Sequence, residues 1–265
     1  MKSYEILDEA NFINIGILLY YEKAKEFIIE LNENLDEWTA PLLFTSFVKK
    51  GIFTIPRDIS LFWVKERVIP SGRQNIGSIL SNHKLKAYDE MKLLELAEGR
   101  CSQDSMFIRR IDDLPEFVLD RQRKNLIDCT PLDSGNILCF FADYSVKKVE
   151  LKAFSNDSKI EKVIKNNALF NSCKIGTGGY CATFNDSIDI PSWELYDKGI
   201  TIPLSYQDFL TFADRNLFDT SESCQELECS RQNITYLNKQ GLLNPVKENV
   251  KGNLYLKGDV IKTRW

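Results

Sequence analysis

The sequence predicts an α+β protein in which antiparallel strands and short helices occupy separate stretches of the chain. Near the N-terminus, the apolar runs FINIGILLYY and EFIIEL are separated by a short polar segment, as in a hairpin. Two further apolar runs surround ADYS, and the C-terminal part combines helical spacing with another strand pair. At 265 residues the chain is long for one core. We therefore expect three domains, over residues 1–125, 133–200 and 216–265.

The composition is that of a soluble globular protein. Hydrophobic residues make up 43% of the chain and charged residues 27%. No apolar run reaches the roughly 18 residues that indicate a membrane span. No basic leader followed by an apolar segment begins at Met1. We therefore expect a cytoplasmic protein that does not bind membranes.

Cysteine and histidine usage disfavours metal sites and most kinds of catalysis. The seven cysteines are scattered without a CxxC pair, and His83 is the single histidine. A structural zinc site needs four closely spaced ligands and a secreted framework needs paired cysteines, so both are disfavoured. We expect reduced thiols that pack as small core residues, no cofactor, and a chain that is not an enzyme.

Charge is distributed unevenly along the chain. Residues 230–265 hold seven Lys or Arg against Glu248 and Asp259, a balance of +5, whereas the whole chain carries −4. Residues 1–229 therefore carry −9. A polyanion should be attracted by the C-terminal segment and repelled by the remainder.

The N-terminal part predicts a hairpin followed by four or five short helices. After Trp38, helical spacing is found in APLLFTSFVKKG, DISLFWVKERVIP, SGRQNIGSILSN and AYDEMKLLELAEG. The block ERVIPSGRQNIGSIL…EGRCSQDSMFI resembles a segment that precedes the kinase core in HipA-type proteins. No Gly-rich loop, HRD-like loop or DFG accompanies it. The resemblance therefore implies a partner context and no kinase activity.

The middle part predicts a small antiparallel sheet with one or two helices. Strand pairs surround ADYS and TGG, and IPSWELYDKG is a short helix that begins after a proline and ends at Gly199. GTGG at residues 176–179 lacks a following lysine, so it is interpreted as a hairpin turn and not as a phosphate loop. Residues 135–199 resemble a small bacterial domain of unknown function, and this resemblance implies no chemistry.

The C-terminal part has the spacing of a helix-turn-helix. After a linker, ITIPLSYQDFLTFADRN, Thr220 or Ser221 can cap a first helix, and Ser230 caps a second helix that Gly241 ends. The apolar positions fall on the mutual face of the two helices: Cys224, Leu227, Cys229, Ile234 and Leu237. The alternative is an ordinary surface helix with a solvated charged face.

The start of the second helix is polar where a reading surface would lie. Arg231 can pair with guanine in a bidentate fashion, and Gln232 or Asn233 can pair with adenine. The Ser230 hydroxyl and the free amides of the helix N-terminus favour a phosphate contact.

A basic hairpin follows the second helix. In LLNPVKENVKGNLYLKGDVIK, two strands flank a turn, and Asp259 is expected to cap a last helical turn. Such a hairpin would act as a wing that sets its lysines beside the phosphate backbone, namely Lys247, Lys251 and Lys257.

The run DTSESCQELECSRQNITYLNKQGLLNPVKE…GNLYLKGDVI resembles the winged helix-turn-helix of MerR-type and excisionase-type proteins. The match rests on the Ser230 cap, on "Y.L...GLL.P" from Tyr236 to Pro245, and on "YL...DV". It implies DNA contacts by Tyr236 and Lys239 as well. Cys224 and Cys229 replace the usual alanine and valine.

The MerR coiled coil does not follow, so a homodimer is expected to pair through residues 1–215. The prediction is a bacterial or phage DNA-binding transcriptional regulator, an autorepressor of a mobile-element, phage or toxin–antitoxin operon. Its residues 1–215 would bind a protein partner. One alternative is an excisionase-like architectural protein that bends DNA. Another is an inhibitor or effector whose activity lies in the N-terminal domains, with the C-terminal part as a targeting module.

Overall fold

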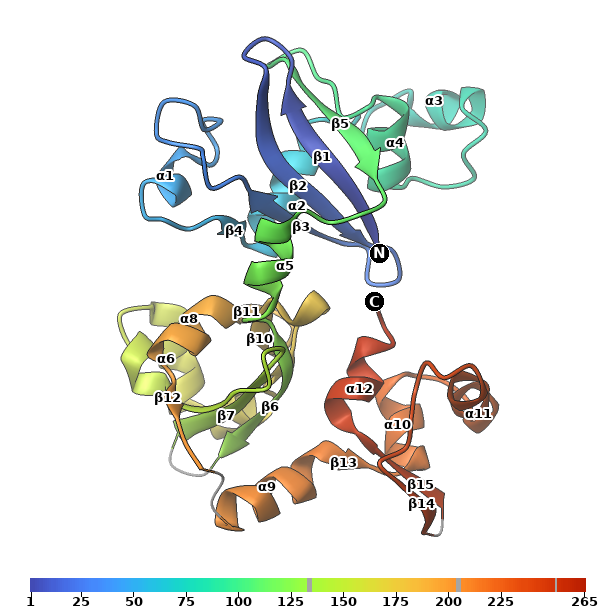
Figure 1. Ribbon diagram of the computed structural model, residues 1–265. Helices are drawn as coiled ribbons and strands as arrows, with labels where there is room; N and C mark the ends of the chain where they lie inside the picture. The colour runs from blue at the N-terminus through green and yellow to red at the C-terminus, as the bar shows by residue number, and fades with distance from the viewer. Residues whose placement is uncertain (133–134, 204–205, 251) are drawn as a thin grey trace. The chain divides into compact units, whose positions relative to one another are not determined.

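The computed structural model describes residues 1–132, 135–203, 206–250 and 252–265. The protein is of the α+β class, with antiparallel sheets and short helices (Figure 1). It divides into two compact units, Met1–Leu119 and Asp120–Trp265, and each is described by itself. Among the described residues, no helix has the length and apolar character needed to cross a membrane.

The first unit is organised around a five-stranded antiparallel sheet with the order β4-β3-β2-β1-β5. The predicted hairpin is confirmed by the pairing of β2 with β3. Every residue of β2 from Ile15 to Tyr21 is buried. Strands β1 and β5 are additions that the local pattern did not predict. The strand bounds are β1 Lys2–Asp8, β2 Ile13–Tyr21, β3 Glu26–Leu31, β4 Thr54–Ile55 and β5 Met106–Ile111.

Short helices follow the hairpin, as the spacing predicted, and residues of several of them pack in the core of this sheet. Trp63 and Val64 from α2 and Leu94 from α4 join the sheet residues in one buried cluster. The helices are α1 Thr45–Val48, α2 Arg57–Lys65, α3 Ile76–Asn82 and α4 Glu90–Leu96; a fifth, α5 Glu116–Gln122, follows β5.

Between Leu126 and Thr201, the second unit contains two small sheets where one was predicted. One has the order β12-β8-β7-β6 and the other β11-β10-β9. The strand pairs around ADYS and TGG are both found. The strands are β6 Leu126–Leu132, β7 Asn136–Phe141, β8 Val146–Glu150, β9 Lys174–Ile175, β10 Cys181–Phe184, β11 Ile188–Pro191 and β12 Ile200–Thr201. The helices are α6 Ser158–Lys165, α7 Asn167–Asn171 and α8 Ser192–Lys198.

The GTGG segment is a tight turn, as expected. Residues Thr177–Gly179 form one 3-10 turn between β9 and β10. Gly179 has φ +73°, and a Cβ built on it would lie 2.2 Å from the carbonyl oxygen of Leu126. The turn is therefore packed against the first residue of β6, and a larger side chain does not fit there.

The predicted linker before the C-terminal helices is wrong in its larger part, because it contains helix α9, Tyr206–Asn216. This helix packs on the four-stranded sheet. Phe212 lies 4.9 Å from Phe140 between ring centroids, and Lys148 forms an ion pair with Asp208 at 3.6 Å. Phe209 and Phe212 of this segment are three residues apart, a spacing that is typical of a helix.

After α9 come the two predicted helices and the predicted hairpin (Figure 1). A short strand before the helices pairs with the second hairpin strand, which gives a third small sheet with the order β13-β15-β14. The elements are β13 Leu217–Phe218, α10 Thr220–Glu226, α11 Arg231–Lys239, β14 Lys247–Val250, β15 Gly252–Leu256 and α12 Lys257–Lys262.

Helix α12 joins two hydrophobic cores. Val260 is buried in a cluster with Ile234, Leu237, Leu243 and Tyr255, which we call the C-terminal core. The next residue, Ile261, is buried in the larger cluster of the two sheets. Because neighbouring side chains of one short helix fill both cores, the predicted middle and C-terminal segments belong to one compact unit.

Candidate nucleic-acid interface

Helix α10 begins with a capping box. The carboxylate of Asp219 accepts hydrogen bonds from the amides of Ser221 and Glu222, and the Glu222 carboxylate accepts one from the Asp219 amide at 2.8 Å. The cap is therefore Asp219, which corrects the expected cap at Thr220 or Ser221. The D-x-x-E spacing is a known capping signal.

The turn between α10 and α11 has the hydrogen bonds of a Schellman motif. The Cys229 amide donates to the Cys224 carbonyl at 2.9 Å, and the Glu228 amide donates to the Gln225 carbonyl at 3.2 Å. Glu228 takes the left-handed position, with φ +50°. Cys229 then leads directly into Ser230, so the entry of α11 is set by the end of α10.

Helix α11 has the predicted cap and the predicted end. The Ser230 hydroxyl oxygen accepts a hydrogen bond from the Asn233 amide at 3.4 Å. At the other end Gly241 has φ +69°, and the Leu242 amide donates to the Leu237 carbonyl. Both helices therefore end in Schellman motifs, one with glutamate and one with glycine at the left-handed position.

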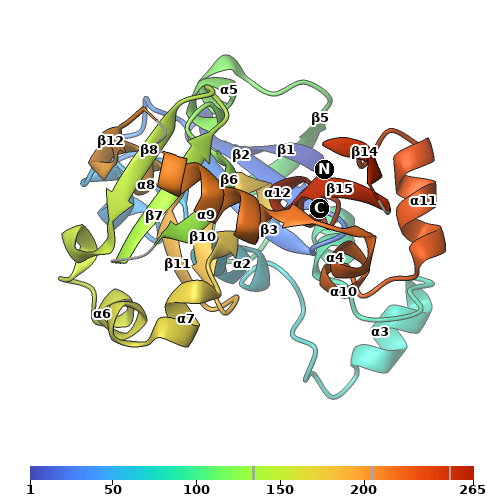
Figure 2. The ribbon, with the colours of Figure 1, turned by 90° about the horizontal axis from the view of Figure 1, so that it is seen from below.

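The two faces of α11 differ sharply in exposure. Ile234 and Leu237 are 1% and 9% exposed and pack in the C-terminal core. The side chains of Arg231, Gln232 and Asn233 are exposed. As predicted, the apolar side chains anchor the helix and the polar first turn faces solvent. Figure 2 shows α11 at the edge of the unit, beside the hairpin of β14 and β15.

The predicted guanine-reading residue has a local partner. The Arg231 guanidinium donates to the Ser221 hydroxyl at 2.9 Å, which ties the first turn of α11 to the first turn of α10. Both side chains are exposed. A hydrogen bond between exposed groups contributes little net stability, because water replaces it. The guanidinium can therefore exchange this partner for a ligand.

Three further predicted residues lie on exposed positions of α11 and the hairpin. Tyr236 is 56% exposed, and Lys239 is exposed in the last turn of α11. Lys247 is exposed at the start of β14, opposite Leu254. The remaining hairpin lysine of the prediction, Lys251, lies outside the described residues.

Lys257 is placed apart from the others. It is the first residue of α12, and its ammonium donates to the Cys173 carbonyl at 3.2 Å. The expected cap at Asp259 is wrong, because α12 begins two residues before it. Asp259 pairs instead with Lys262 at 3.1 Å. The early start follows from Gly258, whose amide donates to the Asp128 carboxylate on β6.

Sequence reasoning missed a buried polar junction around Asp128. Asn216, at the end of α9, donates to the Asp128 carboxylate at 2.8 Å and accepts a hydrogen bond from the Thr130 hydroxyl. Desolvation by burial raises the pKa of Asp128, although these hydrogen bonds and Lys257 oppose the shift. The available signal was polar residues inside the apolar strand LIDCTPL.

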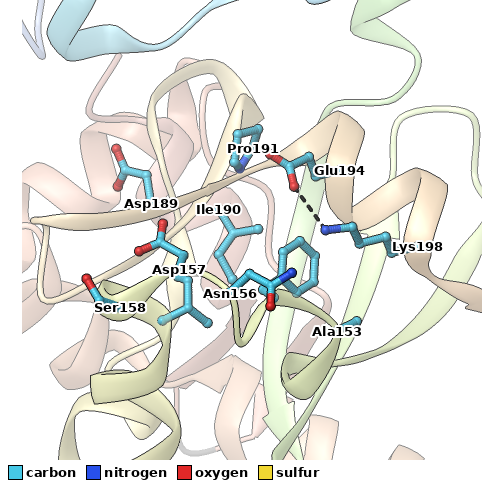
Figure 3. A pocket seen from close by; sticks show the side chains of 11 residues that line it. Ala153, Asn156, Asp157, Ser158, Asp189, Ile190, Pro191, Glu194 and Lys198 are labelled. Carbon is cyan, nitrogen blue, oxygen red and sulfur yellow. Dashed lines mark hydrogen bonds and ion pairs between the residues drawn. The ribbon is translucent and has the colours of Figure 1, made fainter. Parts of the chain in front are cut away.

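A pocket of about 560 Å³ lies elsewhere in this unit (Figure 3). Phe154 and Ile190 line it, together with the carboxylates of Asp157, Asp189 and Glu194. Asp157 caps α6 by accepting a hydrogen bond from the Lys159 amide, and Glu194 pairs with Lys198 at 3.2 Å. These groups are engaged by the fold. The predicted nucleic-acid residues are not among those that line the pocket.

Comparison with known proteins gives no relative: no family model, no curated protein and no solved structure matches the chain.

Proposed function

We propose that this protein binds double-stranded DNA in a sequence-specific manner, with α11 as the reading helix. The observation that carries the proposal is the exposed Arg231-Gln232-Asn233 turn on a helix whose opposite face is anchored by buried Ile234 and Leu237. A helix held in this way can enter a major groove without losing its packing.

The chemistry of the exposed turn suits base edges. A guanidinium donates two hydrogen bonds to guanine, and carboxamides match the donor and acceptor of adenine. The capped N-terminus of α11 carries the positive end of the helix dipole, which favours a nearby phosphate. Basic residues at the end of α11 and at the start of the hairpin, Lys239 and Lys247, extend this favourable potential.

The hairpin after α11 serves in this proposal as the wing of a winged helix-turn-helix of the MerR or excisionase type. The role is that of a cytoplasmic transcriptional regulator that represses its own operon. Residues 1–215 would supply a homodimer contact and a protein partner, because one such module discriminates poorly between sites by itself. Light scattering of the whole chain tests for the dimer, and footprinting shows how many half-sites it protects. A monomer that protects one half-site contradicts this part of the proposal.

The proposal is tested by selection of duplexes from a randomised library with the whole chain, followed by sequencing. We expect enrichment of one motif that contains a guanine and an adenine close together, read by α11. A parallel selection with Ile234 and Leu237 intact but with Arg231, Gln232 and Asn233 all replaced by alanine is the matched control. Enrichment of the same motif by that variant, or no enrichment by the natural chain, contradicts the proposal.

A further inference from the structure

Two cysteines meet at the turn between α10 and α11. In a Schellman motif the residue two positions after the cap approaches the residue three positions inside the helix, and their side chains commonly touch. Here these residues are Cys229 and Cys224, joined by the amide-to-carbonyl bond of 2.9 Å. Both side chains pack against the same C-terminal core. Local backbone geometry therefore places the two cysteine residues side by side.

These thiols are open to reagents. Cys224 and Cys229 are each partly exposed, and both are free cysteines. Elsewhere in this unit, Cys129 and Cys173 have their sulfurs 3.7 Å apart. That pair is fully buried. The hydrogen bond between Cys129 and Cys173, together with burial, also raises the pKa of Cys129, which keeps its thiol protonated.

We propose that Cys224 and Cys229 are a site of reversible oxidation, and that a peroxide converts them to a disulfide across the turn that leads into α11. The thiolate of one cysteine attacks a peroxide oxygen, breaks the O–O bond and becomes a sulfenic acid. The second thiol attacks that sulfur and breaks its S–O bond. With hydrogen peroxide, two thiols lose two electrons and two protons, and the peroxide leaves as two molecules of water.

Charged and buried surroundings affect the thiol of Cys224. Desolvation raises the pKa of Cys224, with a further contribution from Cys229, while the Arg231 guanidinium opposes the shift. The raised pKa disfavours the thiolate of Cys224. In the proposed reaction either sulfur can be the first nucleophile, and the other resolves the sulfenic acid.

The disulfide would change the start of the reading helix. Cys229 is followed directly by the cap residue Ser230 and by Arg231, whose guanidinium rests on Ser221 of α10. A covalent bond draws Cys229 toward α10 and moves the first turn of α11 with it. The effect on DNA rests on the proposed function, whereas formation of the disulfide does not.

The experiment treats the whole folded chain with a small excess of hydrogen peroxide at neutral pH, blocks free thiols and digests with trypsin. The cleavage product from Asn216 to Arg231 contains Cys224, Cys229 and no other cysteine. Its oxidised form is therefore identified by the loss of two hydrogens and by the absence of the blocking group. We expect this form to accumulate first and to disappear on treatment with dithiothreitol.

Cys224→Ala and Cys229→Ala are the matched controls, because small apolar residues keep the core contact. In either variant the remaining thiol should stop at a sulfenic acid. A Cys129–Cys173 crosslink that forms first, or a fully blocked peptide after oxidation, overturns the proposal.

A second readout is binding to a duplex selected by the reduced chain. We expect oxidation to weaken it roughly tenfold, an amount comparable to the loss of one bidentate base contact, and neither alanine variant should respond. A disulfide without change in binding overturns the effect on α11. Failure of the reduced chain to bind any duplex contradicts the proposed function and leaves the peptide result to decide the oxidation site.

Discussion

Helices α11 and α12 are both short and basic, and they lie within the same C-terminal segment, yet they use their cations differently. On α11, Arg231 and Lys239 are exposed, and Arg231 donates a hydrogen bond to the neutral, exposed Ser221 hydroxyl. The cations of α12 and of the residues after it bind groups of the protein itself: Lys257 binds the Cys173 carbonyl, Lys262 binds Asp259, and Arg264 lies 3.4 Å from Glu226. Helix α11 is a candidate surface for a ligand, whereas α12 connects two hydrophobic cores of the fold.

A count of charges along the sequence therefore does not define a binding surface. The balance of +5 over residues 230–265 includes all these cations equally. An ammonium that already binds a carbonyl or carboxylate neutralises less of an approaching polyanion. In this account, the charge available to DNA is concentrated on α11 and the hairpin.

The largest effect is expected from a substitution at Gly258, where α12 contacts Ile127 and Asp128 of β6. In Gly258→Ala, the new Cβ would lie 2.6 Å from the Ile127 carbonyl oxygen and 2.8 Å from the Asp128 carboxylate carbon. We expect a loss of about 3 kcal/mol in the free energy of unfolding of this unit, because backbone cannot yield as a flexible side chain can. Urea-dependent hydrogen exchange of peptides from α12 measures it.

Gly77→Ala is the matched control for that substitution. Gly77 lies within α3, where an added Cβ meets nothing within 4 Å. Alanine there should leave stability unchanged or raise it by up to about 1 kcal/mol. An equal loss in both variants would mean that the close approach at Gly258 is unimportant.

Arg231→Ala tests whether the exposed arginine of α11 contacts a base. We expect specific binding to weaken by about 1–3 kcal/mol, since one bidentate base contact is lost. Arg264→Ala removes the same charge from the segment but from a residue paired with Glu226, so its effect on specific binding should be small. Competition titrations with selected and scrambled duplexes give both values. Equal losses on the two duplexes would count against base reading.

A smaller effect is expected from the hairpin. Lys247→Ala should weaken binding to every duplex and lower the slope of log affinity against log salt by about one. Lys262→Ala, in which the lost ammonium is paired with Asp259, should leave the slope nearly unchanged. Titrations at several salt concentrations separate the two variants, and identical slopes would remove the hairpin from the interface.

The contribution of Asp128 to the stability of this unit should also depend on pH. Because burial raises the pKa of Asp128, the folded state holds this proton more tightly than the unfolded state does. The resulting stability is present below the ordinary pKa of an aspartate and is lost as pH rises through the raised value. The stability of the natural chain relative to Asp128→Asn should therefore fall as pH rises from about 4. A difference that grows with pH contradicts this.

Local signals explain which parts of the candidate interface could be predicted from sequence. The Ser230 cap, the Gly241 end and the buried Ile234 and Leu237 depend on spacings of a few residues, and all four are confirmed. The capping box at Asp219 and the helical spacing of α9 are also local signals. The predicted cap at Thr220 or Ser221 and the predicted linker are nevertheless wrong.

The remaining strand pairs and side-chain contacts depend on pairing between distant parts of the chain, which no local pattern encodes. Strand β1 pairs with β5 through Ser3 and Ile111. Lys257 meets a carbonyl 84 positions away, and Gly258 meets a carboxylate 130 positions away. Lys257 lies in a basic segment and was therefore predicted to contact DNA, whereas its ammonium binds the Cys173 carbonyl just before β9.

The most direct test of the reading role of α11 is chemical protection of guanine in a selected duplex. Dimethyl sulfate methylates guanine N7 in the major groove, the atom that an arginine would cover together with O6. We expect the whole chain to protect one guanine in each half-site. Arg231→Ala should leave this guanine exposed, whereas Arg264→Ala should keep it protected. Absence of guanine protection by the natural chain, or full protection by Arg231→Ala, would contradict the assignment of α11 as the reading helix.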